Sequence, residues 1–207
     1  MKNRNKFVLS FKEYLILEEN SNRVSSATDI LKKDYADVLE FTDKWFEIFG
    51  KPSPDFSMMF SGEPGSGKTS FLLEFAYYLA STFGKILYIS SEEFGSKTLM
   101  DKLKFVITKN IYKDKDVDEI EVPKNLFFAK GFTDLLDYDF IIIDSVTELD
   151  LDIQEFREIK DIYPDKAFIL VLQHTKAKMY RGSKEWEHEV SLYADIDKGI
   201  IDVKKNR

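Results

Sequence analysis

Cysteine is absent from the 207 residues of this chain, and long apolar runs are missing as well. The first absence excludes disulfides and thiolate metal sites, and it is typical of proteins from a reducing compartment. The second excludes a membrane helix, which needs roughly 18 consecutive apolar residues, and the start of the chain has no signal-peptide core. We therefore expect no membrane association and a location in the cytoplasm.

An excess of basic residues is also lacking, because the formal net charge is −7 at pH 7. Without a general positive field to attract nucleic acid, any contact with DNA must be local. Hydrophobic residues make up 43% of the chain and include 18 Phe and 10 Tyr, which is typical of a folded protein. The length predicts one well-buried domain with a smaller appendage.

The first part of the chain predicts a helical extension. Apolar residues recur at helical spacing over residues 30–49, and the sequence Lys51-Pro-Ser-Pro54 breaks the pattern. We place the boundary there, with a helical extension over residues 1–50 and the main domain over residues 51–207. The aromatic residues of the extension are expected to form core or a subunit contact, not a ligand site.

The main domain alternates short apolar strands with helical stretches, the pattern of a largely parallel sheet with helices on both faces. Residues 140–143 are apolar at every position, as expected of a strand that is covered on both sides. Two final segments joined through Asp197-Lys-Gly199 predict a hairpin. We expect an α/β fold with strands at 56–61, 85–90, 125–129, 140–144 and 167–173, helices at 68–82, 96–108 and 150–162, and a C-terminal β-hairpin of 192–196 with 199–203.

A phosphate-binding motif of the form GxxxxGK[ST] lies between the first of these strands and the first helix. Its glycines allow a tight turn with inward amides, and the helix amino terminus adds partial positive charge, so the loop suits a polyphosphate. Lys68 is expected to reach the β and γ phosphates of ATP, and the Thr69 hydroxyl to bind Mg2+. The alternative, a glycine-rich turn that only precedes a helix, is disfavoured by this context. The predicted nucleotide-binding residues are Gly62, Glu63, Pro64, Gly65, Ser66, Gly67, Lys68, Thr69 and Ser70.

Carboxylates follow two other predicted strands. Asp144 ends an apolar strand and is the expected second magnesium ligand, although a strand-ending aspartate can also cap a turn. Glu92 and Glu93 end another strand, where a base could orient the attacking water. Glu92 is our first choice and Glu93 the second; the alternative is that both only begin the following helix, where acidic residues are favoured.

Four segments together resemble the RecA-like ATPases, a group of P-loop NTPases, and most closely the branch of RadA, the DnaB helicases and KaiC. The resemblance covers about residues 51–207. The last segment is the most diagnostic, because a sensor strand, a loop, a hairpin and a closing Lys-Asn-Arg follow one another in the order found in RadA. The segments are 62–76, Tyr88–Glu93, Ile141–Ser145, and the series Leu172–Lys176, Arg181–Ser183, Glu187–Val190 and Lys205–Arg207.

The resemblance implies roles that spacing alone does not show. Glu92 aligns with the catalytic glutamate of the family and Gln173 with the residue that senses the γ phosphate. Family members assemble as rings or filaments with nucleotide at each interface, so a homo-oligomer is implied. Lys205 and Arg207 are the candidates for completing the neighbour's site. The alternative is that they belong to a solvated tail.

The resemblance also implies a DNA-contacting loop over residues 174–186. Its basic residues could meet phosphates while Tyr180 and Trp186 stack on bases, but nearby glutamates suit a solvated connection equally well. A zinc segment and a protease-like domain, as in full-length RadA, are not found. The chain therefore looks like a minimal core, as in a stand-alone phage or mobile-element ATPase in a host cytoplasm.

These observations predict an ATPase that acts on DNA in recombination, repair or replication and is stimulated by DNA. The second hypothesis is a KaiC-like assembly or signalling ATPase that does not bind DNA, which the net acidity favours slightly. A small-molecule kinase is disfavoured because no arginine-rich lid is evident.

Overall fold

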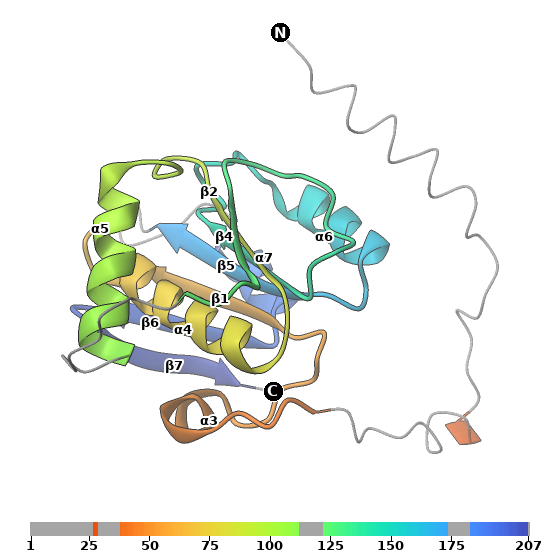
Figure 1. The fold of residues 1–207 in the computed structure, drawn as a ribbon. Coiled ribbons are helices and arrows are strands. Elements are labelled where there is room, and N and C mark those ends of the chain that lie inside the picture. The colour runs from red at the N-terminus through yellow and green to blue at the C-terminus, as the bar shows by residue number, and fades with distance from the viewer. Residues whose placement is uncertain (1–26, 29–37, 112–121, 174–182, 207) are drawn as a thin grey trace, which may run out of the picture. The chain divides into compact units, whose positions relative to one another are not determined.

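Seven strands form one sheet in the part of the chain that the computed structural model describes, residues 27–28, 38–111, 122–173 and 183–206 (Figure 1). The strand order is β3-β2-β4-β5-β1-β6-β7. All neighbours pair in parallel except β6 and β7, which form an antiparallel hairpin. The predicted α/β class, with a mostly parallel sheet and a C-terminal hairpin, is confirmed. The strands are β1 (Ser57–Gly62), β2 (Ile86–Ser90), β3 (Leu126–Ala129), β4 (Phe140–Asp144), β5 (Ala167–Gln173), β6 (Leu192–Asp197) and β7 (Ile200–Asn206).

Helices cover both faces of this sheet (Figure 1). On one face, side chains of α4 join alternate residues of β1, β2, β4 and β5 in a single apolar cluster. On the other face, Phe156 of α6 lies 5.5 Å from Phe168 of β5 and 5.4 Å from Trp186 of α7 between ring centroids. The helices are α3 (Asp43–Phe49), α4 (Lys68–Thr82), α5 (Lys97–Phe105), which continues as a π-helix over Val106–Ile111, α6 (Ile153–Ile162) and α7 (Ser183–Glu189).

The central strands are apolar because they are covered from both sides. Every residue of β1, β2 and the first four positions of β4 is buried. The parallel sheet therefore needs continuous apolar segments in place of alternating ones. Apart from Tyr88, serines are the only polar residues buried within these strands, and the larger polar side chains Asp144 and Gln173 stand at the ends of β4 and β5.

The predicted segments 140–144, 167–173 and 68–82 coincide with β4, β5 and α4. The continuous helix expected over residues 30–49 is wrong for residues 38–42, which are not helical. The Leu39 amide donates to the Pro52 carbonyl at 2.8 Å, so this stretch bonds to a distant segment and α3 begins only at Asp43. Residues 29–37 lie outside the described chain.

Two further differences concern α6 and α7. α6 begins at Ile153 and not at residue 150, because Asp152 and Glu155 form a capping box that starts the helix there. α7 was not predicted; it occupies part of the expected 174–186 loop. The charge-rich sequence of residues 113–121 predicts a loop, and this stretch lies outside the described residues.

Helix α3 packs against α4 through aromatic side chains. The Trp45 ring lies 4.7 Å from that of Phe75, and Phe41 and Phe49 contact the same ring. The compact unit of the structure begins at Val38, whereas the sequence placed a domain boundary near residue 51. The aromatic residues of α3 therefore belong to the core of the main unit, apart from Phe46, which is 48% exposed.

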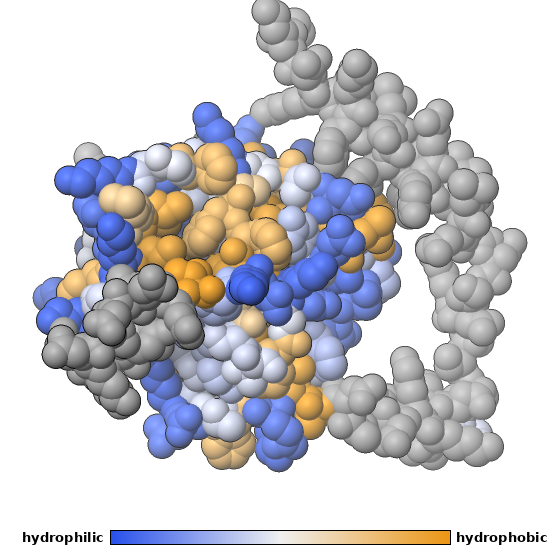
Figure 2. Space-filling model, viewed as in Figure 1, coloured by the Kyte–Doolittle hydropathy of each residue, from blue (hydrophilic) through white to orange (hydrophobic). Residues whose placement is uncertain are grey.

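The surface also carries apolar side chains. On the face seen in Figure 2 they gather in a band bordered by hydrophilic residues. Exposed large apolar residues of the described chain include Phe105 at the end of α5, Leu136, and Ile200 in β7. Within the described residues, no helix combines the length and apolar character needed to cross a bilayer.

Replacing Trp45 by Ala is expected to lower the free energy of unfolding by about 3–5 kcal/mol, because it removes a buried indole from the α3–α4 contact. The matched control is Phe46→Ala on the same helix, which should cost less than about 1 kcal/mol because that ring is half exposed. Chemical denaturation of both variants measures the difference. Equal losses would contradict the placement of α3 in the core.

Candidate functional site

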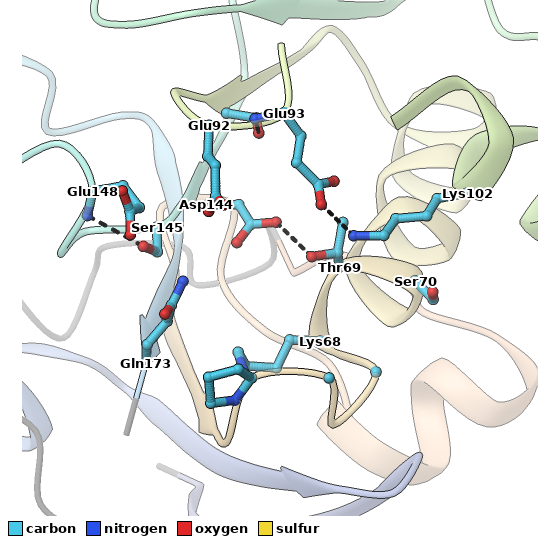
Figure 3. Close-up of a pocket in the computed structure, with 14 residues that line it drawn as sticks. Lys68, Thr69, Ser70, Glu92, Glu93, Lys102, Asp144, Ser145, Glu148 and Gln173 are labelled. Atoms are coloured by element: carbon cyan, nitrogen blue, oxygen red, sulfur yellow. Dashed lines mark hydrogen bonds and ion pairs between the residues drawn. The ribbon is translucent and has the colours of Figure 1, made fainter. Parts of the chain in front are cut away.

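The carboxyl ends of β1, β4 and β5 meet at one edge of the sheet, where a pocket of about 360 Å3 opens. Parallel strands place their carboxyl ends together, so residues distant in sequence converge there. The pocket brings together Lys68, Asp144, Glu92 and Gln173, all of which the sequence had singled out (Figure 3). Its lining consists of Pro64, Gly65, Gly67, Lys68, Thr69, Ser70, Ser90, Glu92, Glu93, Lys102, Asp144, Ser145, Glu148 and Gln173.

The glycine-rich loop after β1 has a shape that only glycine permits at its ends. Gly67, which caps α4, has φ of 101° in the left-handed region. Gly62 has φ of 154°, and a Cβ added there would lie 2.3 Å from the carbonyl oxygen of Ile196. The β6 strand therefore approaches the loop so closely that no side chain fits between them.

The turn of the β6–β7 hairpin also supports this loop. The Gly199 amide donates a hydrogen bond of 3.0 Å to the Ser66 carbonyl. Within the loop, the Ser66 amide donates to the Glu63 carbonyl at 3.1 Å. The Ser66 hydroxyl is buried without a hydrogen-bond partner in the described chain.

Lys68 is folded back onto the loop that precedes it. Its ammonium donates to the carbonyl oxygens of Gly62 at 2.9 Å and Glu63 at 2.8 Å. Burial lowers the pKa of Lys68, and the nearby Asp144 carboxylate partly opposes this shift. An ammonium held only by neutral carbonyls can exchange them for phosphate oxygens, with which it makes stronger, charge-assisted hydrogen bonds.

Asp144 accepts two hydroxyl hydrogen bonds on the same oxygen. Thr69, the second residue of α4, donates to Oδ2 at 3.0 Å, and Tyr88 of β2 donates to Oδ2 at 2.7 Å. Burial raises the pKa of Asp144, while the hydrogen bonds from Tyr88 and Thr69 act in the opposite direction. A hydroxyl and a carboxylate beside a phosphate loop are the hard oxygen ligands that Mg2+ prefers, so the donor set fits that ion.

The two adjacent glutamates after β2 differ in their surroundings. Glu93 pairs through Oε1 with the ammonium of Lys102 on α5 at 2.5 Å. Glu92 forms no hydrogen bond or ion pair with the described residues and lines the pocket. Figure 3 shows Glu92 extending toward the space beside Asp144, whereas Glu93 turns away toward Lys102.

Several pocket residues were not found from the sequence. Lys102 lies on α5 and reaches the pocket only because of how α5 packs beside α4. Glu148 and Ser145 follow β4, and the Glu148 amide donates to the Ser145 hydroxyl at 3.3 Å. Ser145 directly follows the predicted magnesium ligand and ends the segment Ile141–Ser145 of the family resemblance, whereas Lys102 and Glu148 had no sequence signal.

Lys205, the one of the two C-terminal candidates that the structure describes, does not line this pocket. Lys205 of β7 donates to the carbonyl oxygen of Val190 at 2.5 Å and also to that of Glu187. It thereby anchors the end of α7 in its own chain, and its role in a neighbour's site stays a prediction. Arg207 lies outside the described residues.

Most of the proposed DNA loop, residues 174–182, lies outside the described chain. Trp186 is described, and it is 5% exposed and packed against Phe156. The expectation that Trp186 stacks on bases is therefore wrong for this conformation, because its ring belongs to the core. Lys184 is exposed at the start of α7.

Comparisons with known proteins support the fold and one short stretch of sequence. No protein-family model matches the chain. The flagellar accessory protein FlaH from Methanocaldococcus jannaschii has a similar structure, with a TM-score of 0.55 over 83% of this chain and 88% of that chain, at 13% identity. The DNA repair protein RadA of Synechocystis sp. is 33% identical over 67 residues, which are 32% of this chain and 13% of that protein. The chain has the RecA-like fold, and its sequence match spans a small part of the curated relative.

Substituting Gly62 by Ala should destabilise the protein by about 2–5 kcal/mol, because the added Cβ meets the Ile196 carbonyl and the backbone conformation is strained. The control is Gly131→Ala, where nothing lies within 4 Å of the added atom. Thermal unfolding followed by circular dichroism reports both effects. Similar melting temperatures for Gly62→Ala and the native chain would show that β6 does not hold the loop this closely.

Proposed function

We propose that this protein binds ATP with Mg2+ and hydrolyses it. The observation that carries the proposal is the hydrogen bond of 3.0 Å between the Thr69 hydroxyl and the Asp144 carboxylate, in the same pocket as Lys68. A fortuitous glycine turn would give no reason for a carboxylate from another strand to meet the first turn of the helix. The motif and the acid thus support each other from separate parts of the chain.

Each residue of the loop has a distinct part in this proposal. The backbone amides from Gly65 to Thr69 and the ammonium of Lys68 hold the phosphates. The oxygens of Thr69 and Asp144 hold the ion, either directly or through its water. When bound, Mg2+ would neutralise charge on the β and γ phosphates. Lys68 has to leave the carbonyls of Gly62 and Glu63 to reach them.

Glu92 is the proposed base that orients the attacking water. Its carboxylate is exposed in the pocket and is not engaged by another described residue, so it is available to a water molecule. Glu93 is less suited because Lys102 already pairs with one of its oxygens. Gln173 at the end of β5 also lines the pocket, which supports the proposal that it contacts the γ phosphate.

A homo-oligomer is part of the proposal. Exposed apolar side chains such as Ile200, which is 72% exposed beside the loop-supporting turn, are of the kind that contacts between proteins cover. In such an assembly Lys205 and Arg207 would serve a neighbour's nucleotide. The carbonyls that Lys205 now binds would then need another donor.

Replacing Lys68 by Ala should abolish ATP binding or turnover, since it removes the only loop cation expected at the β and γ phosphates.

Replacing Glu92 by Gln should keep ATP binding and reduce hydrolysis by about 100-fold or more, because an amide is a poor base. Nucleotide affinity and phosphate release measure the two properties separately. The matched control is Glu93→Gln, which should stay much closer to the native rate. Normal turnover by the Glu92 variant would reject that residue as the base.

For the biological role, our first candidate is an ATPase that acts on DNA, as the name of the DNA repair protein RadA suggests for that relative. A KaiC-like assembly or signalling ATPase is the second candidate. It is favoured by the net charge of −7 and by the burial of Trp186. The two proposals differ in whether DNA changes the rate of hydrolysis.

If the first candidate is correct, single-stranded DNA should raise the ATPase rate at low salt, and exchange of Lys176 and Lys178 for Ala should remove the stimulation. The charge-matched control exchanges Lys124 and Lys130, which are exposed and lie in other segments. Steady-state ATPase assays with and without DNA, beside mass measurement with ATP, test this. ATP-dependent assembly with no DNA effect would select the second candidate.

A further inference from the structure

Tyr88 is a buried polar residue that the proposed chemistry does not use. Its side chain is 0% exposed and lies in the apolar cluster between the sheet and α4. Its hydroxyl donates a hydrogen bond of 2.7 Å to Oδ2 of Asp144. A buried tyrosine hydroxyl needs an acceptor, and here the acceptor is the carboxylate proposed to serve the metal.

The contact follows from the register of two parallel strands. Tyr88 lies opposite Ile142, and Ser90 lies opposite Asp144. Tyr88 and Asp144 therefore point to the same face of the sheet but are offset by two residues, about 6.6 Å along the strand. The tyrosine side chain is long enough to span that offset, so its hydroxyl lies beside the carboxylate.

The ring itself is held in place. The Phe128 ring of β3 lies 5.4 Å from the Tyr88 ring, and the pocket-facing side of Asp144 is met by Thr69 from α4. Two donors from two different elements thus converge on Oδ2, while neither bonds to Oδ1. This arrangement defines the orientation of the carboxylate before any ligand is present.

We propose that Tyr88 is a positioning residue for magnesium: its hydroxyl fixes the rotamer of Asp144 so that Oδ1 faces the ion or its water beside Thr69. Tyr88 touches neither nucleotide nor metal and acts only through Asp144. Hydrogen bonds of this kind to metal-binding carboxylates change metal affinity by about 10–100-fold. The inference rests on the proposed binding of Mg2+ and ATP.

The chain contains a matched control on a different strand. Tyr193 of β6 is also buried, and its hydroxyl donates to Oδ1 of Asp195 at 2.8 Å. The Ser61 hydroxyl shares this cluster, at 3.1 Å from the Tyr193 oxygen. None of these three residues lines the pocket. Tyr193→Phe therefore removes the same chemical contact, a tyrosine hydroxyl on a carboxylate, without touching the proposed magnesium site.

The experiment compares Tyr88→Phe with Tyr193→Phe and the native full chain. Mn2+ is titrated into each protein saturated with a non-hydrolysable ATP analogue, and free Mn2+ is followed by electron paramagnetic resonance. The analogue's affinity is measured separately in EDTA. Tyr88→Phe should weaken Mn2+ binding by about 10-fold or more and leave metal-free nucleotide affinity unchanged, whereas Tyr193→Phe should change neither.

A double-mutant cycle with Asp144→Asn tests the route of the effect. If Tyr88 acts through Asp144, the Tyr88→Phe exchange should have little further effect on Mn2+ binding in a chain that already carries Asp144→Asn. Equal Mn2+ affinity of Tyr88→Phe and the native chain, or an undiminished effect in that background, would overturn the inference. Native protein that binds neither the analogue nor Mn2+ would instead overturn the proposed function, and this inference with it.

Should Tyr88→Phe fail to fold, the native side chain can be observed directly. Site-specific 3-fluorotyrosine at position 88 gives a fluorine resonance that should shift when Mg2+ is added to the nucleotide-loaded protein. The same label at position 193 should not respond. A resonance at position 88 that is insensitive to Mg2+ would contradict the proposed role.

Discussion

The meeting of Thr69 and Asp144 is the contact on which the site depends. It joins the first turn of α4 to the end of β4, across 75 positions of sequence. The contact exists only because β1, β5, β4 and β2 run parallel in this order and end at the same edge. The buried strands hold that order, and the apolar segments of β1, β4 and β5 are therefore as much a requirement of the site as its polar residues.

The electrostatics of the pocket follow from this burial. Lys68 and Asp144 are partly withdrawn from water, which lowers the pKa of Lys68 and raises the pKa of Asp144. Both shifts favour the neutral form of the side chain. Hydrogen bonds to neighbours partly compensate each charge for the lost hydration: Lys68 donates to loop carbonyls, and Asp144 accepts from two hydroxyls. Both charged forms gain further from a ligand that brings the opposite charge. The pocket therefore suits a ligand that carries both charges, as in the proposed complex of Mg2+ with ATP.

The sequence predicted the elements that carry continuous patterns. The apolar segment of β4 and the motif before α4 each have a local signature, and both were found at the correct residues. α7 was missed because its seven residues contain one large apolar side chain, and that helix is held by the packing of Trp186 on Phe156 and by the Arg157–Glu189 pair. The contacts of Tyr88 and Lys102 could not be predicted from the sequence either, because they depend on strand register and helix packing, which no short motif encodes.

The hydrogen bond from Gly199 to Ser66 has a consequence for how the protein is divided. A fragment ending before β6 would retain the entire glycine-rich motif and every acid of the pocket. It would nevertheless lose the amide that braces the loop and the carbonyl of Ile196 that lies against Gly62. The recognisable motif is therefore shorter than the unit that gives it its shape, and that unit extends to the last strand of the sheet.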